Sequence, residues 1–97
     1  MVQTVCTYWL LAKEKKIILE KPHTLNRIFF SILTVISTTN GYDIRVSFDD
    51  PQFRSYYSLR GPRKYLEAEG EDIFQGNIWI SNISTADVEV SATEILH

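Results

Sequence analysis

The strictest constraint on the fold is a period-two alternation within Asn77–Leu96, near the end of the chain. Apolar and polar residues alternate over Val88–Thr93, which is typical of a β-strand with one buried and one solvated face. A second β-branched run, Ile78–Ile80, precedes it, and the polar stretch Asn82–Asp87 lies between the two. This segment predicts a β-hairpin that closes a β-rich domain.

The same alternation recurs over Tyr42–Asp49, directly after Asn40-Gly41, a dipeptide that favours a tight hairpin turn. Its register predicts that Ile44, Val46 and Phe48 face inward and that Asp43, Arg45 and Ser47 face solvent. Valine, isoleucine and threonine together number 25 and alanine only four, a composition that suits strands better than helices. We therefore expect an all-β fold over residues 1–97: a single antiparallel β-sandwich or barrel of seven to eight strands, with more than about 40% strand.

Charge and hydropathy exclude several classes of partner. The formal net charge is −2, so no general attraction to nucleic acid is expected. The longest membrane-like run, Ile28–Ile36, is far shorter than the ~20 residues that span a bilayer. The N-terminus lacks a basic region before its apolar run, so no signal peptide is expected. The sequence predicts a soluble domain with no membrane span.

The residues that enzymes use are sparse in this chain. The histidines are His23 and His97, and no phosphate-binding or metalloprotease motif occurs. Cys6 is the single cysteine, which rules out an intramolecular disulfide and favours an inert buried thiol. We expect no enzyme activity, no catalytic residues and no cofactor. The Asn82-Ile83-Ser84 sequon is interpreted as part of a turn.

Two acidic groups, Asp49-Asp50 and Glu67–Asp72, raise the question of calcium. Calcium takes six to eight oxygen ligands, commonly from loops. Neither group has the ligand order of an EF-hand, so we interpret both as solvated acidic surface and predict no metal site.

Cations and aromatic residues are interleaved around the Gly61-Pro62 turn. Arginine and tyrosine dominate interface hot spots and stack on sugars or bases. The alternative is an edge strand whose positive residues prevent aggregation. We nevertheless select this region as the best candidate for ligand or partner binding, with these residues: Arg54, Tyr56, Tyr57, Arg60, Arg63, Lys64 and Tyr65.

Two segments, Val2–Ala12 and Arg27–Ser37, are apolar on both alternations. In the second, one face is expected to carry Ile28, Phe30, Ile32 and Ile36, and the other Phe29, Leu33 and Val35. One small sandwich core covers only one face of each strand, so Phe29, Leu33 and Val35 need another cover. Large exposed apolar patches are uncommon on soluble monomers, and a closed homo-oligomer would supply that cover. A helical segment or a wrapping by Arg63–Gly76 is the competing explanation.

The stretches Gly76–Asn82 and Val88–Ile95 together resemble the closing segment of small virion accessory proteins of phages and other viruses. The resemblance implies a jelly-roll β-sandwich that decorates capsids, forms fibres or binds host surfaces. It covers about a fifth of the chain and transfers no functional residues.

These observations lead to three functional hypotheses. The first is a non-enzymatic structural or attachment module that forms a homo-oligomer, with a virion as one setting. The second is a module that binds a glycan or another small ligand through Arg54–Tyr65. The third is a small inhibitor of another protein, for which no residue of the chain argues directly.

Overall fold

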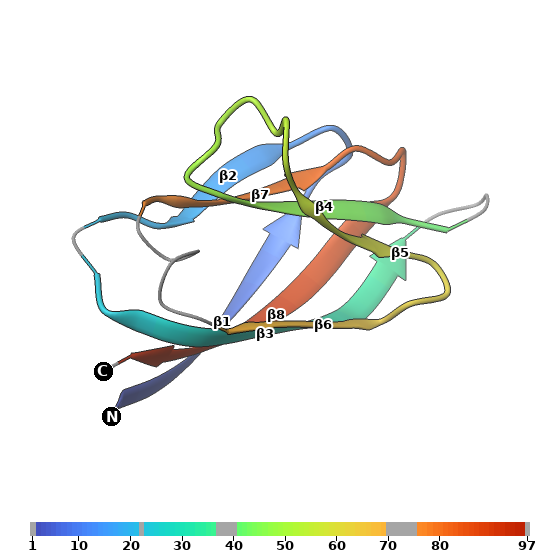
Figure 1. The fold of residues 1–97 in the computed structure, drawn as a ribbon. Coiled ribbons are helices and arrows are strands. Elements are labelled where there is room, and N and C mark those ends of the chain that lie inside the picture. The colour runs from blue at the N-terminus through green and yellow to red at the C-terminus, as the bar shows by residue number, and fades with distance from the viewer. Residues whose placement is uncertain (1, 22, 37–40, 70–75, 97) are drawn as a thin grey trace.

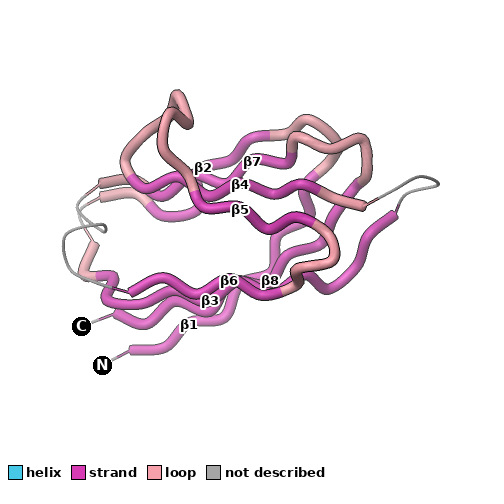
Figure 2. The backbone as a smooth tube through the Cα atoms, turned by 45° about the vertical axis from the view of Figure 1, so that its right-hand side comes forward, coloured by secondary structure: helices cyan, strands magenta, loops and turns pink. Residues whose placement is uncertain are grey.

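The computed structural model describes residues 2–21, 23–36, 41–69 and 76–96, and within them it contains eight strands and no helix (Figure 2). The all-β prediction and its strand content are confirmed. The strands are β1 (Val2–Leu10), β2 (Lys15–Leu19), β3 (Leu25–Ile36), β4 (Asp43–Phe48), β5 (Tyr57–Arg60), β6 (Tyr65–Glu69), β7 (Ile78–Asn82) and β8 (Asp87–Leu96).

The strands form two antiparallel sheets of four, stacked as two layers (Figure 1). Sheet A has the order β1-β8-β3-β6 and sheet B the order β2-β7-β4-β5. The strand that begins the chain and the strand that ends it are neighbours, with Val2 opposite Leu96. The two chain ends therefore lie side by side at one end of sheet A.

The pairing follows a simple rule along the chain. Counted inward from the two chain ends, β1 pairs with β8, β2 with β7, β3 with β6 and β4 with β5. Two further pairs, β3 with β8 and β4 with β7, complete the sheets. The chain is thus a long antiparallel hairpin, with its tip between β4 and β5, that is rolled into two layers.

Apolar side chains from both sheets meet between the layers. Alternation aims every second residue inward, and β8 shows this most regularly, with Val88, Val90 and Ala92 fully buried. The other large buried apolar side chains are Leu10, Leu25, Ile28, Phe30, Ile44, Val46, Leu59, Leu66, Ile78 and Ile80. The inward positions predicted for Ile44 and Val46 are confirmed.

Both predicted hairpins are wrong. β7 and β8 lie in opposite sheets, so the residues between them connect the layers. Gly41 has the positive φ of a turn, +69°, but β3 and β4 on its two sides also belong to different sheets. Asn40 lies outside the described residues. A turn signal specifies a reversal of the chain, and it does not specify whether the next strand stays in the same sheet.

Two register predictions also need correction. Ser47 is fully buried, because the turn after β4 folds over it and the Asp50 carbonyl accepts a hydrogen bond from its Oγ (2.6 Å). In β3 the register shifts between Ile32 and Thr34, as at a β-bulge, where one extra residue reverses the alternation beyond it. Ile36, expected on the same face as Ile28, is consequently exposed.

Candidate functional site

The predicted binding region does not form one surface, because Arg54–Tyr65 crosses from one layer to the other. Tyr57 begins β5 in sheet B, whereas Tyr65 begins β6 in sheet A. The connection between them carries Arg63 and Lys64, both exposed. The seven predicted residues are therefore divided among three places.

The first place is the turn between β4 and β5, on sheet B. The guanidinium of Arg45 lies over the ring of Tyr56, 4.4 Å from its centroid, a favourable cation–π contact. The rings of Tyr57 and Phe48 meet edge to face at 5.3 Å. Arg54 is largely exposed, with its Nε 3.7 Å from Asp50 Oδ1. All three of these predicted residues thus make contacts within the domain, and Arg54 does so while largely exposed.

Asp50 organises that turn through its carboxylate. Its carboxylate accepts hydrogen bonds from the backbone N–H groups of Gln52 (3.1 Å), Arg54 (2.8 Å) and Ser55 (3.2 Å). Desolvation opposes ionisation of the carboxyl, but these hydrogen bonds outweigh it and lower the pKa of Asp50.

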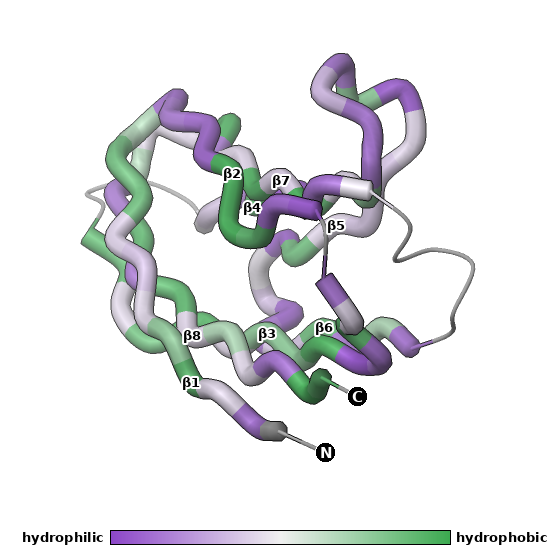
Figure 3. Tube along the Cα trace, turned by 90° about the vertical axis from the view of Figure 1, so that its left-hand side faces the viewer, coloured by the Kyte–Doolittle hydropathy of each residue, from purple (hydrophilic) through white to green (hydrophobic). Residues whose placement is uncertain are grey.

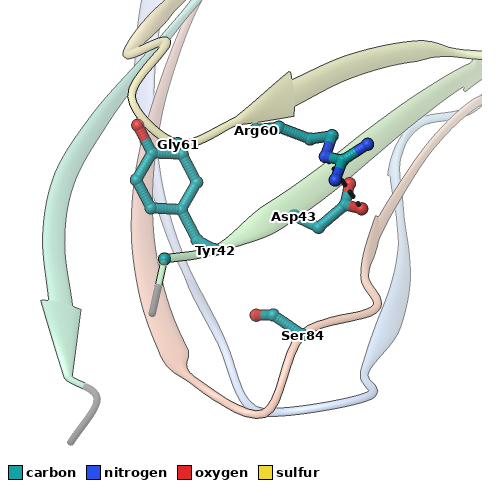
Figure 4. A pocket seen from close by; sticks show the side chains of 6 residues that line it. Tyr42, Asp43, Arg60, Gly61 and Ser84 are labelled. Atoms are coloured by element: carbon teal, nitrogen blue, oxygen red, sulfur yellow. Dashed lines mark ion pairs between the residues drawn. The ribbon is translucent and has the colours of Figure 1, made fainter. Parts of the chain in front are cut away.

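The second place is an open depression of about 440 Å³ at the end of β4 and β5 (Figure 4). Arg60 lies on its rim, and its Nε is 3.8 Å from Asp43 Oδ2. Arg45 Nε lies 3.7 Å from the other oxygen of the same carboxylate, so Asp43 stands between two guanidinium groups. The depression is lined by Gly41, Tyr42, Asp43, Arg60, Gly61 and Ser84. Sequence reasoning missed Asp43 as a site residue, because it was assigned only to the solvated face of β4.

The third place is the connection into β6, on sheet A. Backbone groups dominate here: the Arg63 carbonyl accepts a hydrogen bond from Tyr42 Oη, and the Lys64 carbonyl accepts one from Ile32 N–H (2.9 Å). The Tyr65 ring stacks on Phe29, with centroids 5.9 Å apart. Tyr65 thus belongs to the outer face of sheet A together with a predicted oligomer-interface residue.

That outer face carries several exposed apolar side chains. Leu33 is 53% exposed and Phe29 is half-buried, whereas Val35 follows the bulge and pairs opposite the inward-facing Val88. Arg27 binds the neighbouring acidic residues of β6, with its Nε 2.9 Å from Glu67 Oε1 and 3.9 Å from Glu69 Oε2. Glu67 and Glu69 of the predicted acidic group Glu67–Asp72 are thus paired with Arg27. The other two acidic residues, Glu71 and Asp72, lie outside the described residues.

Glu94 is the most unusual ionisable residue, and its sequence context gives no signal for it. It lies on the inward face of β8, only 5% exposed, and its Oε1 has no hydrogen-bond partner. Burial raises its pKa, while His23 nearby favours the charged form. Burial, followed by the charge of Glu94, also raises the pKa of Tyr8. A buried carboxyl oxygen without a hydrogen-bond partner is costly to a fold.

The histidine beside Glu94 is held by backbone groups. His23 Nδ1 accepts a hydrogen bond from Leu25 N–H (3.3 Å), which leaves Nε2 to donate to the Gly76 carbonyl (2.7 Å). His23 is therefore a loop-fixing residue in this structure. His97 lies outside the described residues.

Asn82 of the sequon is a structural residue. Its side chain is fully buried, and Nδ2 donates to the carbonyls of Leu10 (3.1 Å), Leu11 (3.2 Å) and Ala86 (2.7 Å). The Ser84 N–H donates to Asn82 Oδ1 (3.0 Å). A glycan on Nδ2 would replace one of its two hydrogens and would have to be accommodated at a fully buried side chain, which agrees with the interpretation of the sequon as part of a turn.

No group of three or more His, Cys, Asp or Glu side chains within the described residues could hold a metal ion. Over the same ranges, the structure contains no helix with the length and hydropathy needed to cross a membrane.

The fold has a counterpart among solved structures. No protein-family model matches the chain, and no curated protein matches it in sequence. A solved structure of a Bacillus endospore appendage, described as one of a novel family of disulfide-linked pili, matches with a TM-score of 0.51. The match covers 99% of this chain and 87% of that one at 10% sequence identity. At this identity the likeness shows a shared fold.

Proposed function

We propose that this domain is a non-enzymatic structural module that self-associates into a fibre- or appendage-like assembly. The observation that carries the proposal is the likeness to an appendage subunit over 99% of the chain. The viral fibre implied by the resemblance of the C-terminal segment would be one assembly of this kind.

The proposal includes a finer fold assignment, a jelly-roll sandwich. Jelly rolls are eight-stranded folds of two sheets. In support of the assignment, the strands pair as β1·β8, β2·β7, β3·β6 and β4·β5 and roll into two four-stranded sheets.

Exposed apolar side chains give the proposal a second support. Val5, Leu33, Ile36 and Tyr65, all in sheet A, are more than half exposed. Burying such side chains against another subunit would remove apolar surface from water, worth roughly 25 cal/mol per Å².

Covalent linkage would differ from that described for the appendage neighbour. These 97 residues contain one cysteine, Cys6, which is half-buried in β1. One thiol can join at most two subunits, so a continuous disulfide-linked series cannot be built from these residues alone. Repeated assembly of this domain would depend on non-covalent contacts.

Sedimentation equilibrium across the micromolar range tests the proposal. We expect a mass above that of the 11.2 kDa chain, shifting toward the monomer on dilution, with a β-type circular dichroism spectrum throughout. Negative-stain electron microscopy of the most concentrated sample would reveal any ordered assembly. A folded protein that sediments as a monomer at every concentration would contradict the proposed function.

Binding of a glycan or another small ligand is the second candidate, and the depression at Asp43 and Arg60 favours it. Arg60 lies on the rim of the depression with its side chain 74% exposed, so its guanidinium could donate hydrogen bonds to a ligand. The ring of Tyr42 lines the same depression and offers a surface on which a sugar could stack. A glycan array with the native protein and Arg60→Ala tests it. Binding that the substitution abolishes would support this candidate, and the absence of any binding would reject it.

A further inference from the structure

The four sheet edges of this domain differ in how they are protected. An edge strand presents unpaired N–H and C=O groups that another strand can join, and natural proteins commonly block edges with charges or shorten them. β2, β5 and β6 are four or five residues long, and each carries charged side chains. Those charges are Lys15 and Lys16 in β2, Arg60 in β5, and Glu67 and Glu69 in β6.

The edge formed by β1 has none of these protections. Its nine residues, VQTVCTYWL, include no charged residue, no proline and no glycine. Figure 3 shows β1 as pale to green along its length, apart from a purple segment near its start. Gln3, Thr4, Val5 and Thr7 are exposed, and Val5 is exposed by 62%. Inward- and outward-facing residues are thus both uncovered in the first half of the strand.

One contact closes the far end of this edge. Lys16 Nζ donates a hydrogen bond to the carbonyl oxygen of Trp9 (3.1 Å), a bond from outside the β1–β8 ladder. Successive residues of an antiparallel strand direct their backbone groups to opposite sides. Gln3, Val5 and Thr7 share the orientation of Trp9, so their N–H and C=O groups face the open edge.

We propose that β1 is a self-association edge, which pairs antiparallel with β1 of a second copy of this chain and joins two A sheets into one continuous sheet. This inference rests on the proposed function and names the surface through which that function begins. Such pairing supplies affinity through main-chain hydrogen bonds. A two-fold axis through β1 would make the contact isologous and closed.

The charges on the edges select a second copy as the partner. Like charges directly opposite each other destabilise a strand pair. Antiparallel self-pairing of β6 about its centre would set Glu67 opposite its own copy, and β2 and β5 would carry cationic side chains of both copies into seams of only five and four residues. In β1, self-pairing brings together only uncharged side chains. Of the four edges, β1 is the longest and the only one that brings no charged side chain into a homotypic seam.

Charge complementation tests the proposal. The variant Val5→Lys/Thr7→Lys brings lysines of the two copies opposite each other in either of two registers. If the two-fold axis passes through Val5, position 5 faces position 5 of the second copy. If the axis passes through Cys6, position 5 faces position 7. We expect this variant to dimerise at least tenfold more weakly than the native chain, and Val5→Glu/Thr7→Glu to do the same. An equimolar mixture of the two should regain native affinity as a heterodimer, because lysines then face glutamates.

Gln52→Lys/Thr85→Lys is the matched control, since it adds the same charge at exposed turn positions and should leave the association unchanged. Sedimentation gives the affinities, and circular dichroism confirms that each variant is folded. If the native chain associates but the β1 variants associate equally well, the β1 inference is wrong and the proposed function stands. Variants that are weakened but not restored by mixing would reject pairing between copies. A monomeric native chain would reject the proposed function together with this inference.

Discussion

The two ends of the β1–β8 pair treat their buried polar groups in opposite ways. Where β1 ends, Asn82 satisfies three backbone carbonyls with one amide and accepts hydrogen bonds from Ser84. Where β1 begins, Glu94 is buried opposite Thr4 with one oxygen unpaired. The first end gains stability from its polar residue, whereas the second carries a polar residue that lowers it. We call the end of the strand pair at Asn82 the closed end, because its buried polar groups are hydrogen-bonded. The end at Glu94 has a buried oxygen without a partner and is the weaker end.

The largest effect that would sharpen this contrast is expected from Asn82→Ala. The substitution leaves the carbonyls of Leu10 and Ala86 buried without this donor, and we expect a loss of roughly 2–4 kcal/mol in the free energy of unfolding. Urea denaturation measures it. Asn77→Ala is the matched control, because Asn77 Oδ1 accepts only an exposed hydrogen bond from Lys21 N–H. Similar losses for both variants would show that the closed end is not special.

The second prediction concerns Glu94→Gln at the other end. Burial raises the pKa of Glu94 in the folded state above its unfolded value, so the folded protein binds this proton more tightly. The contribution to stability is full below the unfolded pKa and is lost as the pH rises through the folded pKa. We therefore expect the variant to be more stable than the native protein at neutral pH, by less than the Asn82 effect.

Thermal unfolding of the two proteins from pH 4 to pH 8 checks this prediction. The stability difference should shrink as the pH falls, because the native carboxyl then becomes neutral as well. His23 must be included in the design, since its charged form would favour ionised Glu94, and a His23→Gln background removes that influence. A stability difference that does not depend on pH would disprove the assigned cause.

The smallest effect is expected from Lys13→Ala at the closed end. Lys13 Nζ donates to the Ile83 carbonyl (2.6 Å), but both groups are exposed, and water can replace the contact. We expect a change within about 0.5 kcal/mol in the free energy of unfolding. A loss comparable to that of Asn82→Ala would mean that surface contacts, and not the buried amide, hold this end together.

Local patterning predicts the strands of this fold well and their partners poorly. The alternation at Ile44 and Val46 identifies the inward face, because that signal depends only on the period of a strand. The assignment of Ser47 to solvent fails, because its cover comes from the turn that follows β4. The hairpin predicted at Gly41 fails for a related reason: the turn signal is local, whereas the choice of sheet is decided by the whole chain.

The candidate site shows the same limit. Arg54–Tyr65 is continuous in sequence, and its mixture of cations and aromatics predicts one surface, but the chain changes layers within it. Asp43 and Arg60 come together only through the register of β4 with β5. The alternation of β8 places Glu94 on the inward face. A charged residue normally lies in solvent, however, so the sequence alone did not predict that Glu94 is buried. The features that sequence reasoning missed therefore depend on contacts between strands that are far apart in the chain.

The pairing of β1 with β8 also constrains the order in which the chain can fold. Val2 lies opposite Leu96, so β1 finds its neighbour only when β8 has been made. Apart from β4–β5, no strand pairs with the next one along the chain. Such non-local pairing makes folding slow, typically milliseconds to seconds. Until β8 is available, the uncharged β1 has two open edges instead of one, and unpaired edges of this kind make an incompletely folded chain prone to aggregation.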